Sequence, residues 1–180
     1  MLKSRQDFIA YRQTAQKAYE AQSKKIVVCA GTGCVASGSL KIHARLKELM
    51  EAKGLPVSVE LMEDPHGEEI GLKKSGCHGF CEMGPLVRME PQGWLYTKVK
   101  IEDCEEIIEK TIEKGECVDR LAYKKNGEIY REQSSIPFYK QQTRVVLEHC
   151  GKIDSDSIRE YIAIGGYAAF EKVLAVLGVW

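Results

Sequence analysis

The sequence predicts an α/β fold, in which helices flank a mixed β-sheet. Three observations support this: residues 25–29 form a short β-branched run, residues 42–50 repeat apolar side chains at helical spacing, and residues 86–99 hold two strand-like runs around a turn. The chain has 180 residues, of which 44% are hydrophobic and 29% are charged. A chain of this size can bury one sizeable core and has residues left over for a small appendage.

The charge balance and the hydrophobic pattern argue against two classes of partner. Lys and Arg total 26 and Asp and Glu total 26, so the net charge is zero and no overall field attracts nucleic acid. Uninterrupted apolar stretches reach about five residues, as at 26–30, whereas a membrane span needs roughly 20. Residues 1–7 lack the pattern of a secretory signal, so we expect a cytoplasmic protein whose seven cysteines are kept reduced.

Residues 1–22 are expected to form an amphipathic N-terminal helix. Apolar residues recur on one face, with polar and charged residues between them. This face consists of Phe8, Tyr11, Ala15 and Ala18. The helix docks either on its own domain or on a partner subunit, and both alternatives stay open at this point.

The next elements follow the order strand, helix, strand. Residues 25–29 indicate a buried strand that enters a loop of small residues. A helix follows, with Ser37 or Ser39 as its N-cap and a stop at Gly54. Residues 57–62 alternate like a second strand, and the crossover should be right-handed. The apolar face of the helix consists of Ile42, Leu46, Leu49 and Met50.

A turn at 64–67 precedes the second cysteine pair, and a hairpin and a closing helix follow it. Residues 86–89 and 94–99 flank a turn that contains proline and glycine. The closing helix ends near Gly115. This order of elements is typical of a thioredoxin-like α/β fold, to which we assign residues 23–120. The apolar side of the closing helix consists of Ile101, Cys104, Ile107, Ile108, Thr111 and Ile112.

Residues 121–180 differ in character from the preceding domain. Short polar and aromatic segments give way to helical patterns at roughly 139–149, 156–163 and from about 167 onward. The apolar side chains of the last helix have no evident burial partner, so we expect this tail to be mobile or to be covered by another chain. These side chains are Phe170, Val173, Leu174, Val176 and Leu177.

Four cysteines in two glycine-rich loops are the candidate functional residues. Cys29-x4-Cys34 and Cys77-x3-Cys81 are separated by a whole strand-helix-strand unit. Glycines let backbone N–H groups approach the sulfurs closely, and such hydrogen bonds help to set the reduction potential of an iron-sulfur cluster. Four thiolates are the ligand set of a [2Fe–2S] centre, so we expect the four cysteines to bind one.

Other assignments of these residues stay open. Four thiolates also form structural zinc sites, so a zinc-stabilised interaction or scaffold domain is the first alternative. A thiol-disulfide oxidoreductase is the second, although neither pair has C-x-x-C spacing. His78 has no second histidine at the spacing of a Rieske centre, so we expect His78 and Phe80 to be loop and packing residues. Cys104, Cys117 and Cys150 are assigned to structure.

Two motifs resemble a known family. Residues 77–85, CHGFCEMGP, resemble the second half of the motif in thioredoxin-like [2Fe–2S] ferredoxin domains. Residues 138–151 and 160–167 are similar to the segment that leads into the NADH-oxidising flavoprotein of complex I-like enzymes. Together they resemble the N-terminal region of the flavoprotein (beta) subunit of NAD(P)-linked, electron-bifurcating [FeFe]-hydrogenases, and of related NADH dehydrogenase and formate dehydrogenase subunits.

The resemblance implies a complete subunit that is longer than this chain. Residues 121–180 would then be a linker and the start of a flavoprotein-type domain, and FMN and NAD(P) are expected only in the full-length subunit or a partner. We therefore expect one-electron transfer inside a multisubunit NAD(P)H-linked oxidoreductase, next to other flavin and Fe–S subunits. The chain alone is not expected to be catalytic. Pro85 resembles the proline that thioredoxin-like folds place before a strand, often in cis.

Overall fold

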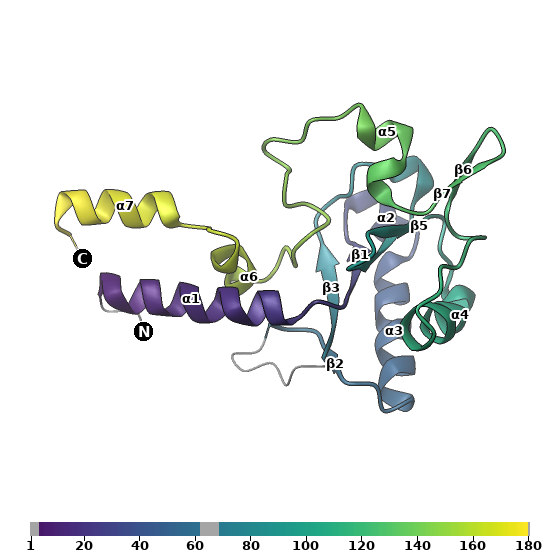
Figure 1. The fold of residues 1–180 in the computed structure, drawn as a ribbon, viewed down its shortest axis with the longest axis horizontal. Coiled ribbons are helices and arrows are strands. Elements are labelled where there is room, and N and C mark those ends of the chain that lie inside the picture. Colours follow the sequence, from purple (N-terminus) through teal and green to yellow (C-terminus); the bar gives the residue numbers. More distant parts are fainter. Residues whose placement is uncertain (1–3, 62–68, 180) are drawn as a thin grey trace.

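The computed structural model describes residues 4–61 and 69–179 of the chain (Figure 1). The turn predicted at 64–67 and the last residue of the strand predicted at 57–62 lie outside these residues. The described part forms a mixed five-stranded sheet with helices on both faces and a C-terminal segment that continues along the domain. The α/β fold class predicted from the sequence is confirmed.

The central strand of the sheet is β1 (Lys25–Cys29), and the strand order is β2-β3-β1-β4-β5. β1 runs parallel to β3 (Ile70–Ser75), which runs parallel to β2 (Val57–Ser58). On its other side β1 pairs antiparallel with β4 (Val87–Glu90), which forms the predicted hairpin with β5 (Trp94–Tyr96). The turn before β4 contains Pro85, whose peptide bond is cis.

The sequence does not predict β3, the strand that leads into the second cysteine loop. A glycine and two lysines interrupt the apolar pattern by which strands are found. Lys73 is nevertheless fully buried, because its Nζ lies 3.0 Å from a carboxylate oxygen of Glu160, which is far away in the sequence. The local hydrophobic pattern therefore cannot reveal that β3 is buried, because the burial of Lys73 depends on Glu160.

β2 is shorter than the predicted strand at 57–62, because carbonyl groups beyond Ser58 accept hydrogen bonds from side chains instead of from a neighbouring strand. Lys73 Nζ donates to the carbonyl of Val59 at 3.1 Å. Arg159 donates to the carbonyl of Leu61 at 2.9 Å. These carbonyl groups are thereby withdrawn from the sheet.

Two helical segments cover one face of the sheet (Figure 1). The first is α3 (Ser39–Ala52), and the second joins η2 (Ile101–Asp103), α4 (Cys104–Glu106) and η3 (Ile107–Glu113), the last with π-helical hydrogen bonds. This second segment is the predicted closing helix, although Ile101 is exposed. The main core between helices and sheet includes Ile26, Val28, Ile42, Leu46, Met50, Leu72, Val87, Met89, Tyr96, Cys104, Ile107 and Ile108.

A short helix, α2 (Thr32–Ala36), stands where the sequence predicts only a loop, and it changes how α3 begins. The N-cap of α3 is Gly38, and the prediction of Ser37 or Ser39 is wrong. The φ angle of Gly38 is 94°, a left-handed conformation that glycine adopts without a steric cost. Ser37 instead donates its hydroxyl to the carbonyl of Gly33 at 3.0 Å.

α1 (Arg5–Ala21) lies beside α6 (Ile158–Ala163), on the other side of the sheet from α3 (Figure 1). Ser4 caps α1 by accepting the N–H of Asp7 at 3.1 Å. The predicted amphipathic helix is confirmed, and it packs on its own chain. Its buried side chains are Phe8, Ala15 and Ala18.

After the closing helix the chain forms a small hairpin that the sequence analysis does not predict. β6 (Tyr123–Lys125) and β7 (Glu128–Tyr130) are antiparallel. Asn126 and Gly127 connect them with φ angles of 52° and 82°, as two-residue hairpin turns require. A 3-10 turn, η4 (Gln133–Ser135), follows.

The helix predicted at roughly 139–149 is wrong. α5 (Pro137–Lys140) ends early, and residues 141–157 form neither helix nor strand. Arg144 in this stretch donates to the carbonyl of Cys77 at 3.1 Å, so the chain is drawn across the second cysteine loop instead of coiling. The helices predicted at 156–163 and from 167 onward are present as α6 and α7 (Ala168–Leu177).

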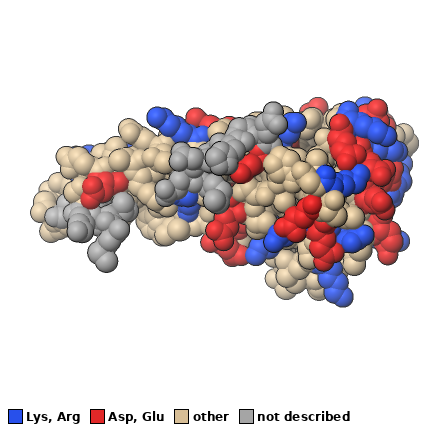
Figure 2. Space-filling view, turned by 90° about the horizontal axis from the view of Figure 1, so that it is seen from below, with Lys and Arg blue, Asp and Glu red and all other residues tan. Residues whose placement is uncertain are grey.

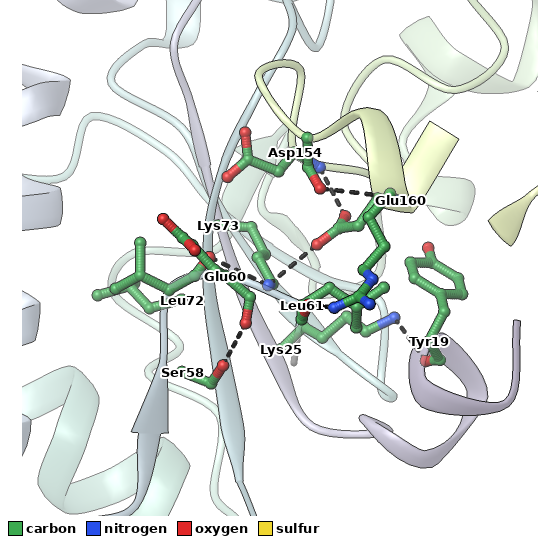
Figure 3. A network of polar contacts seen from close by, with 12 residues as sticks. Tyr19, Lys25, Ser58, Glu60, Leu61, Leu72, Lys73, Asp154 and Glu160 are labelled. Carbon is green, nitrogen blue, oxygen red and sulfur yellow. Dashed lines mark hydrogen bonds and ion pairs between the residues drawn. The ribbon is translucent and has the colours of Figure 1, made fainter. Parts of the chain in front are cut away.

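The C-terminal segment packs on the domain as far as α6, which differs from the expectation that 121–180 is mobile or covered by another chain. Ile136, Ile153 and Ile162 in it are buried. The polar contacts of Lys73 with Glu160 hold α6 against β3 (Figure 3).

α7 projects next to α1 (Figure 1). Most of its large apolar side chains are exposed. Arg5 of α1 pairs with Glu171 of α7 at 2.6 Å. The end of the molecule that these helices form is mostly uncharged in Figure 2. Its exposed apolar side chains include Phe170, Val173, Val176 and Leu177. Among the described helices, none has the length and apolar character to cross a bilayer.

Candidate functional site

The sheet topology brings the two cysteine loops to one edge. Cys29 is the last residue of β1, and Cys77 lies just past the end of β3, the parallel neighbour of β1. Cys34 follows in α2, and Cys81 begins η1 (Cys81–Met83). Because the carboxyl ends of parallel strands meet at the same edge of a sheet, the fold delivers both loops to one place.

Contacts between sulfur atoms link the four cysteines. Cys77 Sγ lies 3.7 Å from Cys81 Sγ. The Cys29 sulfur hydrogen-bonds with Cys34 and with Cys77, and the contact with Cys34 is the main cause that lowers the pKa of Cys29 to about 6. The same contact raises the pKa of Cys34. The structure therefore brings together all four residues that the sequence singles out.

Backbone N–H groups are directed at these sulfurs. The amide of Gly79 donates to Cys77 Sγ at 3.3 Å. The amides of His78 and Gly31 hydrogen-bond Cys29 and also lower its pKa. Donors of this kind favour thiolate over thiol, and they are the groups that tune an iron-sulfur cluster.

Two glycines, Gly31 and Gly84, leave space that the cysteines occupy, and a third, Gly33, lies beside them. A Cβ added to Gly84 would lie 2.7 Å from Cys34 Sγ, and one added to Gly31 would lie 3.1 Å from Cys77 Sγ. A Cβ at Gly33 would lie 3.8 Å from the sulfur of the fourth cysteine, which is an ordinary contact. Gly31 and Gly84 are thus needed for close approach to sulfur, a requirement that a packed core alone does not impose.

The candidate site has a buried side and an exposed side. Cys29 and Cys34 are buried, Cys77 is half-buried and Cys81 is exposed. The buried pair belongs to a small apolar cluster with Phe80, Leu86, Leu95 and Ile136. One pair of thiols is therefore shielded from water by the protein, while the other pair faces the surface.

The donor set and its geometry fit a [2Fe–2S] cluster. In the described part of the chain, no three His, Cys, Asp or Glu side chains converge closely enough to hold a single metal ion. A [2Fe–2S] cluster has a different requirement, since its four thiolates are distributed over two irons. Cys29 with Cys34 and Cys77 with Cys81 form two sulfur pairs, next to space that a Cβ on Gly31 or Gly84 would fill. We call this arrangement the cradle, and it satisfies that requirement.

His78 is a buried loop residue. Its Nε2 lies 2.7 Å from Ser75 Oγ, and its ring lies against Gly151. Burial is the main cause that lowers the pKa of His78 to about 3, and the positive charges of Arg88 and Arg144 add to it. The imidazole is therefore neutral at physiological pH.

Aromatic side chains pack on the second cysteine loop. Phe80 stacks on Phe138 of α5, with ring centroids 4.5 Å apart, and meets Tyr139 edge-on at 5.7 Å. Tyr123 of β6 packs on another side of Phe80 at 5.3 Å. The packing role expected for Phe80 fits these contacts, which join the C-terminal segment to the cysteine loop.

The sequence analysis misses Arg144 and the place of Cys150. The guanidinium of Arg144 donates to the carbonyl of Cys77 at 3.1 Å and to that of Cys150 at 3.2 Å. A Cβ on Gly76 would lie 2.9 Å from Cys150 Sγ, and one on Gly79 would lie 2.8 Å from Arg144 Nη2. The glycines of the second loop were the available signal, because they make room for this segment as well as for a cluster.

The remaining cysteines lie elsewhere. Cys104 is fully buried in the main core, and burial raises its pKa to about 12. Cys117 is half-buried, and burial raises its pKa as well. Their assignment to structure agrees with these positions.

Comparison with known proteins found ferredoxins that are similar to part of this chain. "Ferredoxin, 2Fe-2S" of Clostridium pasteurianum is 33% identical over 88 residues, which cover 49% of this chain and 76% of that protein. "Ferredoxin, 2Fe-2S" of Aquifex aeolicus (strain VF5) is 47% identical over 51 residues, which cover 28% of this chain and 46% of that protein. The crystal structure of the wild-type thioredoxin-like [2Fe-2S] ferredoxin from Aquifex aeolicus aligns with 29% identity and a TM-score of 0.46, over 58% of this chain and 99% of that chain.

The sequence profile of the family described as "Thioredoxin-like [2Fe-2S] ferredoxin" matches residues 10–112. This range contains all four loop cysteines and the whole sheet, and it covers more than half of the chain. The chain therefore belongs to the thioredoxin-like [2Fe–2S] ferredoxin family.

Proposed function

We propose that this chain transfers electrons one at a time through a [2Fe–2S] cluster held by Cys29, Cys34, Cys77 and Cys81. The observation that carries the proposal is the cradle at the edge of the sheet, where a Cβ added to Gly84 or Gly31 would crowd the sulfur of Cys34 or Cys77. Membership of a [2Fe–2S] ferredoxin family supports it. When bound, such a cluster accepts and returns single electrons.

Some residues around the cradle would stabilise the cluster, and others leave one side of it open to a partner. The amides of Gly31, His78 and Gly79 supply hydrogen bonds that stabilise thiolate sulfur. Cys29 and Cys34 keep one side dry, which limits how much water can stabilise a change of charge. The exposed Cys81 is the place at which a partner can come close enough to exchange an electron.

The finer proposal is a multisubunit NAD(P)H-linked oxidoreductase of the electron-bifurcating hydrogenase type. It is supported by the resemblance of residues 138–151 and 160–167 to the entry segment of a flavoprotein. The exposed apolar side chains of α7 are consistent with cover by other subunits that carry flavin and Fe–S groups. FMN and NAD(P) would belong to the full-length subunit or to a partner, in the cytoplasm, where seven free cysteines stay reduced.

Anaerobic purification of the chain tests the cluster. We expect a reddish-brown protein with two irons and two labile sulfides per chain, on the order set by one [2Fe–2S] centre, and a spectrum that dithionite bleaches. A colourless protein that contains zinc would refute electron transfer and favour a scaffold domain.

The assembly is tested separately from the cluster. The chain alone should bind neither FMN nor NADH, and the native complex should have a mass far above that of one 20.2 kDa chain. A flavin band that survives gel filtration of the lone chain would contradict this division of cofactors.

A further inference from the structure

We infer that Arg144 places a fixed positive charge on the second cysteine loop and thereby raises the reduction potential of the cluster. The inference rests on the proposed function, because it requires a cluster at the four cysteines. Arg144 lies outside the range that matches the ferredoxin family, residues 10–112. The charge is therefore a contribution of the C-terminal segment to the site.

The contacts of Arg144 put its guanidinium directly on the loop. One nitrogen donates to the carbonyl of Cys77 at 3.1 Å, and another donates to the carbonyl of Cys150 at 3.2 Å. The guanidinium also approaches Gly79 so closely that a Cβ there would lie 2.8 Å from it. Cys77 is thus contacted by Arg144 through its main chain, while its sulfur remains available as a ligand.

The charge of Arg144 is not neutralised locally. In the described residues no ion pair joins Arg144 to a carboxylate, and its hydrogen bonds run to carbonyl oxygens. Glu148, the acidic residue closest to Arg144 in the sequence, pairs with Lys152 at 3.9 Å. Carbonyl groups orient a guanidinium without cancelling its charge, so a positive charge acts on the loop.

The segment that carries Arg144 is attached to the domain on both sides of it. Before it, Phe138 stacks on Phe80 with centroids 4.5 Å apart. After it, the amide of Ser155 donates to the carbonyl of Lys74 at 3.1 Å. The guanidinium is therefore held in one place, which a mobile surface arginine would not be.

The effect on the cluster follows from charge. Reduction adds one electron, supplied in the test by dithionite, so the bound group becomes more negative by one charge. A nearby fixed positive charge lowers the free energy of the reduced state more than that of the oxidised state. An effect on the order of tenfold in the reduction equilibrium corresponds to 59 mV for a one-electron couple.

Redox titration of loaded variants tests the inference. Arg144→Gln and Arg144→Met remove the charge, Arg144→Lys keeps it, and Lys172→Gln removes one charge from exposed α7 as the matched control. Midpoint potentials are measured by EPR during a mediated dithionite titration, and iron and labile sulfide are counted for each variant. We expect both neutral variants to shift to lower potential by about 59 mV, with the lysine variant and the control near the parent.

The outcomes separate this inference from the function on which it rests. A parent chain without iron and sulfide would overturn the cluster itself. Loaded neutral variants with an unchanged potential would overturn the role of Arg144, as would an equal shift in Arg144→Lys. Loss of iron in both neutral variants, with retention in the lysine variant, would show that Arg144 is a structural strap and would also overturn it.

Discussion

The buried ion pair between Lys73 and Glu160 should be the strongest single polar link between the C-terminal segment and the sheet. Both side chains are almost fully buried, with 0% and 1% of their surface exposed, and the charged atoms are 3.0 Å apart (Figure 3). Lys73 also donates to the carbonyl of Val59, and Glu160 accepts the amide of Asp154 at 2.8 Å. The change Glu160→Gln keeps the shape and the acceptor but removes the negative charge.

The expected cost follows from leaving Lys73 charged and unpaired in the interior. Breaking a buried pair by neutralising one partner costs roughly 3–5 kcal/mol. The contact between Lys73 and Glu160 is close but does not have hydrogen-bond geometry, so we take the lower end, about 3 kcal/mol. This is a large share of a typical folding free energy of roughly 5–15 kcal/mol.

Urea unfolding followed by circular dichroism measures this cost. With a slope of about 2 kcal/mol per molar, the midpoint of Glu160→Gln should fall by about 1.5 M. Asp156→Asn is the matched control, because its pairing with Lys74 at 3.3 Å is exposed and should contribute less than about 1 kcal/mol.

A double variant, Lys73→Met with Glu160→Leu, distinguishes charge from packing. It removes both buried charges and should recover part of the loss, because a buried pair contributes little relative to apolar replacements. The recovery is partial because the carbonyl of Val59 and the amide of Asp154 lose these partners. The reasoning would be refuted if the free energy of unfolding of Glu160→Gln were within about 0.5 kcal/mol of the parent. It would also be refuted if the double variant were much less stable than Glu160→Gln.

Three further predictions concern the cradle and the sheet. Changing any of the four loop cysteines to serine should sharply lower iron and sulfide per chain, while Cys104→Ser should leave them largely intact; equal losses would contradict the ligand assignment. Gly84→Ala should abolish cluster loading, because its Cβ would lie 2.7 Å from Cys34 Sγ. Gly33→Ala is the control and should retain the cluster, because the nearest atom to its Cβ is 3.5 Å away. Similar iron contents in both variants would count against the cradle. Burial lowers the pKa of Lys25 to about 8, so at this residue the unfolded chain binds more protons between pH 8 and about 10.4, and Lys25 should contribute a rise in stability with pH in that window. Lys25→Met should flatten that rise in urea unfolding curves, and an unchanged slope would refute it.

Much of the fold is predictable because its signals are local. β1, the hairpin of β4 and β5, and the buried face of α3 follow from patterns within a few residues. β3 is not predictable in this way, since Lys73 becomes a core residue only through Glu160. The Asn126–Gly127 turn, by contrast, was a local hairpin signal that the sequence analysis did not use.

The candidate site divides along the same line. The spacing of the four cysteines and their glycines can be read directly from the chain, and the topology brings them together. Arg144 itself carries no mark of the carbonyl groups that it binds, and only the glycines of the second loop hint that a segment packs there. The loop at 141–157 has a shape set by tertiary contacts, which override helical propensity.

The pairing of the C-terminal segment with β3 has a consequence for assembly. β2 pairs with Ile70 and Gly71 at the start of β3. Further along β3 the C-terminal segment takes its place, because Asp154 forms a bridge with Ser75 and the amide of Ser155 donates to the carbonyl of Lys74 at 3.1 Å. The segment thereby closes an edge to which strands of other molecules could otherwise add. A partner that pulled it away would uncover a strand next to the second cysteine loop, where its own strand could join the sheet.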